Sequence, residues 1–373
     1  MTSTDPDWEI CEEQASTFES VSSVKPMHRR FPRTMLLCTL LFASLSSALP
    51  SLPQTTPNSA SSPLPLLIWH GLGDKFSNPG LLSIGDLAKA THPGTKVHYI
   101  RVADTPELDQ RGTFFGNISA QLDNVCASLA EELGASKRGK GVRVDALGFS
   151  QGGQFLRGLV ERCPAVSVRS LVTFGSQHNG IAEFQHCGTW DLLCKGAVAV
   201  VGGNAWTDTV QSSIVPAQYY REINQTTGLG SEEYLLHSHF LADINNERVL
   251  KNDVYKERIS ALENFVMYVF EEDTTVVPKE SGWFAEVNAT SGSITPLRER
   301  PMYKEDWLGL RALDRKGGLV FRNTTGKHME LDEEVVKTTF EEFFGPEKAS
   351  LYEVVRWTKQ ESKGWKWPWR KDL

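Results

Sequence analysis

The stretch GFSQGG, residues 148–153, decides which fold this sequence predicts. It ends the alternating apolar run VRVDALGF at 142–149 and leads into QFLRGLVER at 154–162, whose apolar spacing is helical. A serine between glycines where a strand becomes a helix is typical of a nucleophile elbow, because the tight turn exposes the hydroxyl at the edge of a sheet. The alternative is a glycine-rich turn that only reverses the chain. An elbow needs an acid and a histidine later in the chain, so the rest of the sequence decides between the two.

Apolar runs alternate with helical stretches on both sides of this turn. Strands are predicted at 64–69, 96–102, 142–149, 170–175, 263–270 and 317–323. Helices are predicted at 81–90, 118–133, 154–162 and 333–344. Strands that alternate with helices form parallel sheets with both faces covered. The sequence therefore predicts an α/β fold with a mostly parallel sheet and helices on both faces.

An acid and a histidine follow the last two predicted strands, in the order that the elbow requires. Asp273 comes just after the strand at 265–270, and His328 comes after the strand at 319–322. In this layout His328 takes the proton of Ser150, while Asp273 orients the imidazole and stabilises its charged form. Ser150, Asp273 and His328 are the predicted catalytic residues. The alternative is that the acid and the histidine are ordinary loop residues.

Other acids and histidines compete for these positions. Glu271 and Glu272 directly precede Asp273, but Asp273 best fits the pattern D-x-x-V-x-P, which continues to Val276 and Pro278. The competing histidines share one weakness, which is that they do not follow the final strand: His70, His178, His237 and His239. Position in the chain therefore favours Asp273 and His328.

The stretch WHGLGD, residues 69–74, follows the first predicted strand and has glycines where a backbone must approach a substrate. We interpret it as part of an oxyanion hole to which Leu72 and Gln151 contribute main-chain N–H groups. Gln151 is chosen because it directly follows the serine. The alternative is a glycine-rich turn without a ligand.

The composition is that of a folded protein with a full core. The chain has 373 residues, of which 40% are hydrophobic and 23% are charged. The formal net charge is -7, and no long basic run occurs. Nucleic-acid binders usually carry clustered lysine and arginine, so nucleic acid is not an expected partner.

An apolar window near the N-terminus, MLLCTLLFASLSSAL at 35–49, follows a basic cluster. Its apolar core is shorter than a membrane span and ends in small residues, which predicts a signal peptide cleaved after Ala48. The polar, acidic residues before Met27 indicate that Met27 is the true start. The alternative is an uncleaved anchor with a cytosolic tail. The predicted divisions are 1–48 for the extension and signal peptide, 49–63 for a Pro/Ser-rich linker, 64–345 for the folded domain and 346–373 for a basic aromatic tail.

Four cysteines follow the predicted cleavage point: Cys126, Cys163, Cys187 and Cys194. Four cysteines allow three disulfide connectivities, and the short separation of Cys187 from Cys194 fits a local loop. None has the paired spacing of a zinc site, so disulfides in an oxidising compartment are expected and a metal is not. Four sequons are candidate glycosylation sites: Asn117, Asn224, Asn288 and Asn323.

Several long motifs occur in the same order as in one known family. They are WHGLGD (69–74) with NPG (78–80), GFSQGGQFLR (148–157) with ERCP (161–164), FGSQHNG (174–180), HFLADINNER (239–248), the Asp273 segment through Phe284, LGL (308–310) and the segment 325–331. In these motifs, from Leu64 to Leu331, the chain resembles palmitoyl-protein thioesterase. The resemblance implies an α/β-hydrolase fold with an inserted region, about 177–264, between the serine and aspartate strands, and it implies the same triad.

The resemblance also implies which cysteines pair. Cys126 with Cys163, and Cys187 with Cys194, are similar to the two disulfides of the family. Two departures from the family pattern stand out. Lys75-Phe76-Ser77 replaces a vicinal cysteine pair of animal members, so that bridge is absent, and Tyr220 stands where some members have tryptophan.

The activity implied by the resemblance is hydrolysis of long-chain fatty acyl groups from S-acylated cysteines, through an acyl-enzyme and without a cofactor. The expected partners are S-acylated proteins or peptides and long-chain acyl thioesters. The expected location is the lumen of the secretory pathway, a lysosome or vacuole, or outside the cell. The alternatives are a lipase or esterase acting on oxygen esters, and a catalytically silent lipid-binding protein of the same fold.

Two segments have open interpretations. The inserted region is expected to cover the sheet edge and to form much of the acyl site, with GAVAVVGG (196–203) either as a wall of that site or as a buried core helix. The tail from about Pro346 either makes weak contact with a membrane surface or is a solvated, disordered end. No pattern in the sequence indicates an oligomeric state.

Overall fold

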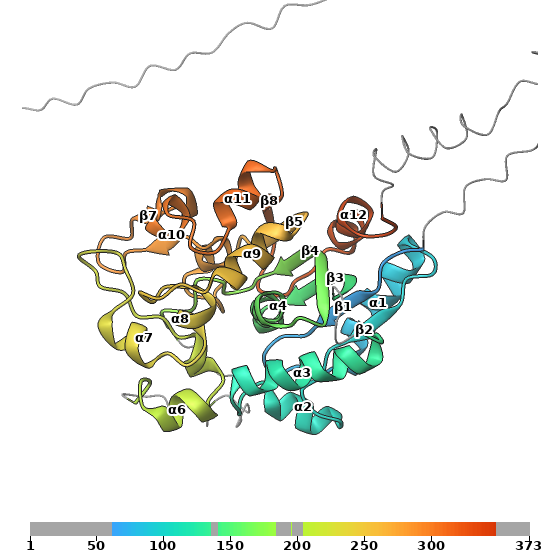
Figure 1. Ribbon diagram of the computed structural model, residues 1–373, viewed down its shortest axis with the longest axis horizontal. Coiled ribbons are helices and arrows are strands. Elements are labelled where there is room, and N and C mark those ends of the chain that lie inside the picture. Colours follow the sequence, from blue (N-terminus) through green and yellow to red (C-terminus); the bar gives the residue numbers. More distant parts are fainter. Residues whose placement is uncertain (1–61, 136–140, 184–194, 196–203, 348–373) are drawn as a thin grey trace, which may run out of the picture. The chain divides into compact units, whose positions relative to one another are not determined.

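The computed structural model describes residues 62–135, 141–183, 195 and 204–347. Its central sheet has six strands in the order β2-β1-β3-β4-β5-β8, and all neighbouring strands are parallel (Figure 1). These strands are β1 (Leu66–Trp69), β2 (Val97–Tyr99), β3 (Val142–Phe149), β4 (Val166–Phe174), β5 (Asn264–Phe270) and β8 (Leu319–Thr324). A separate ribbon pairs β6 (Glu286–Val287) with β7 (Ile294–Thr295).

Helices connect the strands, because parallel neighbours need crossover connections. The α-helices are α1 (Pro79–Thr91), α2 (Pro106–Gly112), α3 (Ile118–Glu132), α4 (Gln151–Arg162), α6 (Asp208–Ser213), α7 (Glu232–His237), α8 (Leu241–Ile244), α9 (Asp253–Ala261), α10 (Pro301–Lys304), α11 (Leu310–Arg315) and α12 (Glu333–Phe343). Short 3-10 helices are η1 (Pro216–Tyr219), η2 (Lys279–Trp283) and η3 (Leu297–Glu299).

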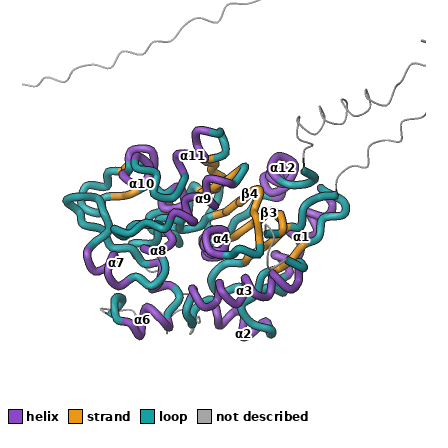
Figure 2. The backbone as a smooth tube through the Cα atoms, viewed as in Figure 1, coloured by secondary structure: helices purple, strands orange, loops and turns teal. Residues whose placement is uncertain are grey.

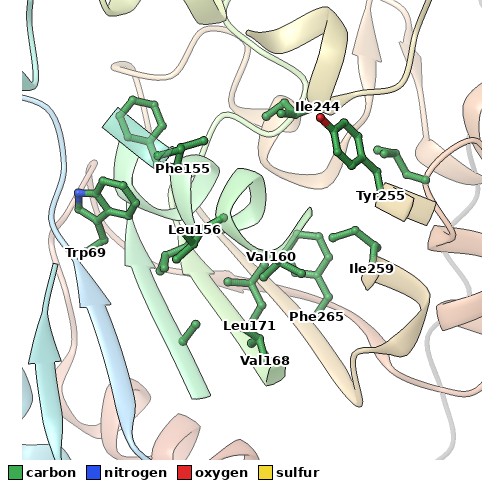
Figure 3. Close-up of a cluster of buried hydrophobic side chains, with 14 of the residues drawn as sticks. Trp69, Phe155, Leu156, Val160, Val168, Leu171, Ile244, Tyr255, Ile259 and Phe265 are labelled. Carbon is green, nitrogen blue, oxygen red and sulfur yellow. The ribbon is translucent and has the colours of Figure 1, made fainter. Parts of the chain in front are cut away.

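Apolar side chains build a core on each face of the sheet. On one face, Ile68 belongs to a core that includes Leu81 of α1 and Phe340 of α12. On the other face, Trp69 belongs to a core that α3, α4 and α9 cover, and its ring lies 5.5 Å from that of Phe155 (Figure 3). Successive strand residues point to opposite faces, so adjacent residues of β1 enter different cores. This confirms the predicted parallel sheet with helices on both faces.

Strand β4 begins earlier than the sequence pattern predicts. It starts at Val166, whereas the apolar run was placed from Ser170 onward. The charged Arg169 interrupts the pattern, but its guanidinium is buried against β3, where Nε donates to Asp145 Oδ1 at 2.9 Å. A buried ion pair between neighbouring strands therefore lies within β4, before the predicted apolar run begins.

The chain between β4 and β5 forms an inserted region that contains α6 to α9 and long loops (Figure 2). Arg157 of α4 anchors it. The Arg157 guanidinium is fully buried and donates to Ile244 O at 2.8 Å and to Asn245 Oδ1 at 2.7 Å. The helix that begins directly after Ser150 therefore also holds the inserted region in place.

Glu161 pairs with Arg157 inside this core. Both side chains are fully buried, and Arg157 Nη1 donates to Glu161 Oε1 at 2.9 Å. Burial raises the pKa of Glu161 to about 8, although the charge of Arg157 acts in the opposite direction. Glu161 therefore binds a proton more tightly in the folded protein than in the unfolded chain.

We expect stability to fall as the pH rises, because of Glu161. The contribution of Glu161 to stability is fully present below the ordinary pKa of 4.5 and is lost as the pH rises through about 8. The free energy of unfolding that is lost over this range is a few kcal/mol. Glu161→Gln should flatten this dependence, measured as the free energy of unfolding in urea from about pH 4 to about pH 9. Glu257→Gln, on the exposed side of α9, is the control. Identical pH profiles for Glu161→Gln and the wild type would contradict this assignment.

A disulfide bond joins Cys126 of α3 to Cys163, which follows α4. The two cysteines are separated by 37 positions in the chain, so the bond closes a sizeable loop that includes the elbow. This is one of the two pairs expected from the family resemblance. Cys187 and Cys194 lie outside the described residues.

Replacing both Cys126 and Cys163 by serine is expected to lower the free energy of unfolding by about 2–4 kcal/mol, because the unfolded chain regains the entropy of the open loop. Chemical denaturation of the oxidised wild type and of the double variant measures the difference. Under a reducing agent the two proteins should converge. Free thiols at both positions in non-reducing peptide maps of the native protein would contradict the pairing.

None of the helices in the described ranges is long and apolar enough to cross a membrane. The predicted signal peptide, the segment 196–203 and almost all of the linker and the tail lie outside the described residues. Their assignments stay predictions.

Candidate active site

Ser150 lies between the end of β3 and the first residue of α4. Its φ of 51° is in the left-handed region, which a residue with a side chain adopts when its surroundings hold it there. Its N–H donates to Phe174 O at 2.8 Å and ties the turn to β4. A Cβ atom at Gly152 would lie 2.2 Å from His70 O, so this position requires glycine. The local geometry is that of an elbow and not of a plain reversing turn.

His328 and Asp273 lie beside the serine. His328 Nε2 is 3.0 Å from Ser150 Oγ, and His328 Nδ1 is 2.7 Å from Asp273 Oδ2. The His328 side chain is 13% exposed and that of Asp273 only 1%. Because Nδ1–H donates to the carboxylate, the lone pair on Nε2 faces the serine hydroxyl. The three residues predicted from separate segments form one hydrogen-bonded chain.

Asp273 is held in its ionised form. Burial by itself raises its pKa, but the hydrogen bond and charge of His328, together with backbone N–H groups, lower it to below the usual value. The N–H groups of Thr275 and Val276 donate to Asp273 Oδ1 at 2.8 and 3.0 Å. The carboxylate therefore faces the imidazole with a full negative charge near neutral pH.

Most of the competing acids and histidines make other contacts. Glu271 and Glu272 are exposed, and Glu271 accepts a hydrogen bond from Asn323. His178 is buried against Phe284, and desolvation holds its pKa well below the usual value. His70 pairs with Asp109, and the exposed His239 lies near Asp208. Within the described part of the chain, His328 is the only acid or histidine whose side chain hydrogen-bonds to Ser150.

Asp109 of α2 holds the loop that follows β1. Its Oδ2 accepts from Phe76 N at 2.9 Å and lies 2.8 Å from His70 Nε2, while its Oδ1 accepts from Val102 N at 2.8 Å. The carboxylate is fully buried. This loop contains Leu72, so Asp109 fixes the backbone next to the serine. No sequence pattern marks Asp109, because its partners come from distant segments.

The N–H groups of Leu72 and Gln151 donate to no protein acceptor among the described residues. The N–H of Gln151 lies at the start of α4, where the helix dipole favours negative charge. The Gln151 side chain is buried, and its Oε1 accepts from the hydroxyl of Tyr219 at 3.0 Å. That bond ties the elbow to the inserted region, a link that no motif predicts. Two free donors beside the serine are compatible with the predicted oxyanion hole, whose role stays a prediction.

A cavity of about 430 Å³ lies beside Ser150 and His328. Such a volume is in the range of small-molecule sites, about 300–1,000 Å³. Its apolar walls are Leu72, Leu81, Ile84, Phe149, Met329 and Leu331. Asp74, Asn78 and Thr275 contribute polar groups. The cavity is therefore mostly apolar and contains one aspartate.

The inserted region does not line this cavity with any of its described residues. Instead, α1, the loop after β1 and the segment after His328 surround that space. The expectation that the inserted region forms much of the acyl site stays a prediction. Val210 and Ile214 of the inserted region pack with Phe114, and Leu72 packs against the same cluster. Residues 184–194 and 196–203 lie outside the described part.

Two further features of the described residues are their potential metal ligands and their glycosylation sequons. Clusters of three or more His, Cys, Asp or Glu side chains able to hold a metal ion are absent from the described residues. Asn224 and Asn323 are exposed, while Asn117 and Asn288 are partly buried. Glycosylation at these four positions stays a prediction.

A parallel sheet covered on both faces, with an elbow serine after β3 and the acid and histidine after β5 and β8, defines the α/β-hydrolase class. The family model for palmitoyl protein thioesterase matches residues 65–328. The chain belongs to the palmitoyl protein thioesterase family, as its motifs indicated.

Similar proteins of known name occur in several organisms. Palmitoyl-protein thioesterase 1 of Caenorhabditis elegans is 33% identical over 83% of this chain and 96% of its own length. Palmitoyl-protein thioesterase 3 of Dictyostelium discoideum is 33% identical over 58% of this chain and 71% of its own length. A lysosomal thioesterase PPT2 homolog of Drosophila melanogaster is 25% identical over 69% of this chain and 82% of its own length.

Proposed function

We propose that this protein removes long-chain acyl groups from S-acylated cysteines of proteins or peptides, with Ser150 as the nucleophile. The observation that carries the proposal is the hydrogen-bonded chain from Ser150 through His328 to Asp273, with separations of 3.0 and 2.7 Å. Membership of the palmitoyl protein thioesterase family supports the choice of a thioester substrate. Two relatives carry palmitoyl-protein thioesterase in their names.

The acylation step begins with attack of Ser150 Oγ on the thioester carbonyl carbon. His328 Nε2 takes the hydroxyl proton, and Asp273 stabilises the imidazolium that forms. The N–H groups of Leu72 and Gln151 receive the negative charge on the carbonyl oxygen. The carbon–sulfur bond then breaks, and His328 returns its proton to the departing cysteine sulfur. The products are a free thiol and an acyl ester on Ser150.

Deacylation repeats this sequence with water. His328 Nε2 takes a proton from a water molecule, whose oxygen attacks the ester carbon. The bond to Ser150 Oγ breaks, and His328 gives the proton back to the serine oxygen. The fatty acid leaves, and the free enzyme is restored. No cofactor or metal enters either step.

The proposed location is the lumen of the secretory pathway or of a lysosome or vacuole. The disulfide between Cys126 and Cys163 supports this location, because such bonds persist in oxidising compartments. The relative from Drosophila melanogaster carries the word lysosomal in its name. The proposed partners are S-acylated proteins or peptides and long-chain acyl thioesters.

A substrate panel tests the proposed reaction. Matched palmitoyl substrates with a cysteine thioester or a serine ester in the same peptide are compared by kcat/KM, together with a triacylglycerol. The proposal predicts the highest kcat/KM for the thioester. Preference for oxygen esters would assign the site to a lipase or esterase. Failure to react with a serine-directed fluorophosphonate would indicate a catalytically silent fold.

A further inference from the structure

The position of the cavity relative to His328 indicates which part of a substrate it binds. In acylation the tetrahedral carbon carries three groups besides Ser150 Oγ: the oxyanion, the acyl chain and the departing sulfur. The sulfur must lie within reach of His328 Nε2, because that atom protonates it. The oxyanion must lie toward the N–H groups of Leu72 and Gln151. The space next to His328 is thus the space that the leaving group enters.

The loops that supply the acid and the histidine form one side of this cavity. Met329 and Leu331 follow His328 directly, and Thr275 belongs to the turn after Asp273. Helix α1 contributes Leu81 and Ile84 to the wall. The cavity therefore extends from the histidine toward α1, whereas Val210 and Ile214 of the inserted region pack with Phe114 and Leu72.

Asp74 gives this apolar cavity an electrostatic preference. Its Oδ1 accepts from Lys75 N at 2.8 Å and from Asn78 Nδ2 at 2.6 Å. Within the described residues Asp74 forms no ion pair, although it lines the cavity. A carboxylate without a countercharge at the wall of an apolar space attracts a cation.

We propose that this cavity binds the polypeptide on the leaving-group side of the thioester, and that Asp74 favours a lysine or arginine near the acylated cysteine. The inference rests on the proposed function and specifies its substrate class. Apolar side chains beside the cysteine pack against Ile84 and Leu331, while a basic side chain approaches Asp74. Peptides with these features are the preferred substrates.

The first test fills the cavity. Ile84→Trp adds bulk to the wall formed by α1, so kcat/KM for a palmitoyl peptide should fall about tenfold or more. Leu82→Trp is the matched control, because Leu82 is on the same helix, is 38% exposed and does not line the cavity. The control should keep the wild-type value. Thermal unfolding of both variants verifies that the fold is preserved.

Two readouts separate a leaving-group site from an acyl site. The acyl chain stays bound during deacylation, whereas the peptide has already left. Ile84→Trp should therefore slow the acylation burst and leave the deacylation rate constant as in the wild type. The ratio of kcat/KM for palmitoyl over octanoyl versions of one peptide should also be unchanged. A collapse of that ratio, or slower deacylation, would show that the acyl chain occupies the cavity and would overturn the proposal.

The second test concerns Asp74. The wild type should prefer a peptide with lysine next to the acylated cysteine over the same peptide with glutamate, by about two- to fivefold for one exposed ion pair. Asp74→Asn keeps an oxygen for Lys75 N and Asn78 and should abolish the preference. Asp86→Asn on the exposed side of α1 is the control. A preference that persists in Asp74→Asn would refute the role of Asp74.

These outcomes are distinct from failure of the proposed function. If Ser150→Ala retained wild-type turnover, the proposed function would fail whatever the peptide preference. If turnover depends on Ser150, but Ile84→Trp leaves kcat/KM for the palmitoyl peptide unchanged and Asp74→Asn leaves the preference for lysine unchanged, the proposed function stands and the leaving-group site is wrong.

Discussion

Ser150→Ala is expected to abolish turnover of S-acyl cysteine substrates while the protein stays folded. Loss of a triad nucleophile lowers kcat by about 10⁴- to 10⁶-fold. The hydroxyl lies at an elbow and contacts His328 Nε2 at 3.0 Å, so its removal leaves the buried cores unchanged. Release of free thiol from a palmitoyl peptide measures the rate, and denaturant unfolding measures the stability.

A second serine serves as the control for this substitution. Ser212→Ala on α6 removes an exposed hydroxyl that donates to the backbone of its own helix. It should keep wild-type kcat. Turnover at the wild-type rate by folded Ser150→Ala protein would contradict the assignment of the nucleophile.

Asp273→Asn is expected to cost about 10⁴-fold in kcat, although the substitution preserves size and shape. An amide oxygen still accepts from Thr275 and Val276, which leaves the NH₂ group facing His328 Nδ1. The amide NH₂ and an Nδ1–H cannot both donate to each other, so His328 Nδ1 must accept. The imidazole therefore carries its proton on Nε2. In that tautomer it cannot accept the proton of Ser150.

The matched control is Glu272→Gln, one residue earlier in the chain. Glu272 is exposed and its backbone N–H donates to Gly326 O, so loss of its charge should change kcat little. The comparison requires that both variants keep the wild-type unfolding transition. If Glu272→Gln lost most of its kcat while Asp273→Asn kept a nearly normal kcat, Glu272 and not Asp273 would be the acid of the triad.

Local patterns in the sequence were sufficient to predict the strands that carry the site. The alternation at 142–149 and the glycines around Ser150 specify a strand-to-helix turn, and the acid and histidine each follow an apolar strand. Because parallel strands end at one edge of a sheet, these segments meet. The chain from Ser150 through His328 to Asp273 follows from that rule.

Local sequence patterns do not predict contacts between segments that are far apart in the chain. Asp109 holds the loop of Leu72 through partners in other elements, and the bond from Tyr219 to Gln151 depends on how the inserted region packs. Arg169 is missed as a strand residue because its charge interrupts the apolar pattern, and the sequence does not show that Asp145 of the neighbouring strand pairs with it.

The walls of the cavity beside the serine could not be predicted from the sequence either. That cavity uses Leu81 and Ile84, which a helical pattern marks only as an apolar face of α1. Whether an apolar residue fills a core or borders a cavity depends on the shape of its neighbours, which sequence spacing does not specify.

The most direct test of the account is to trap the acyl-enzyme. Wild-type protein is mixed with a palmitoyl thioester peptide, quenched in acid within the first turnover, digested and mapped by peptide mass spectrometry. The account predicts a palmitoyl ester on Ser150 that forms with a burst of free thiol and disappears as fatty acid is released. A palmitoyl adduct that forms and turns over on a different residue, or thiol release with no adduct on Ser150 at any time in the burst, would contradict it.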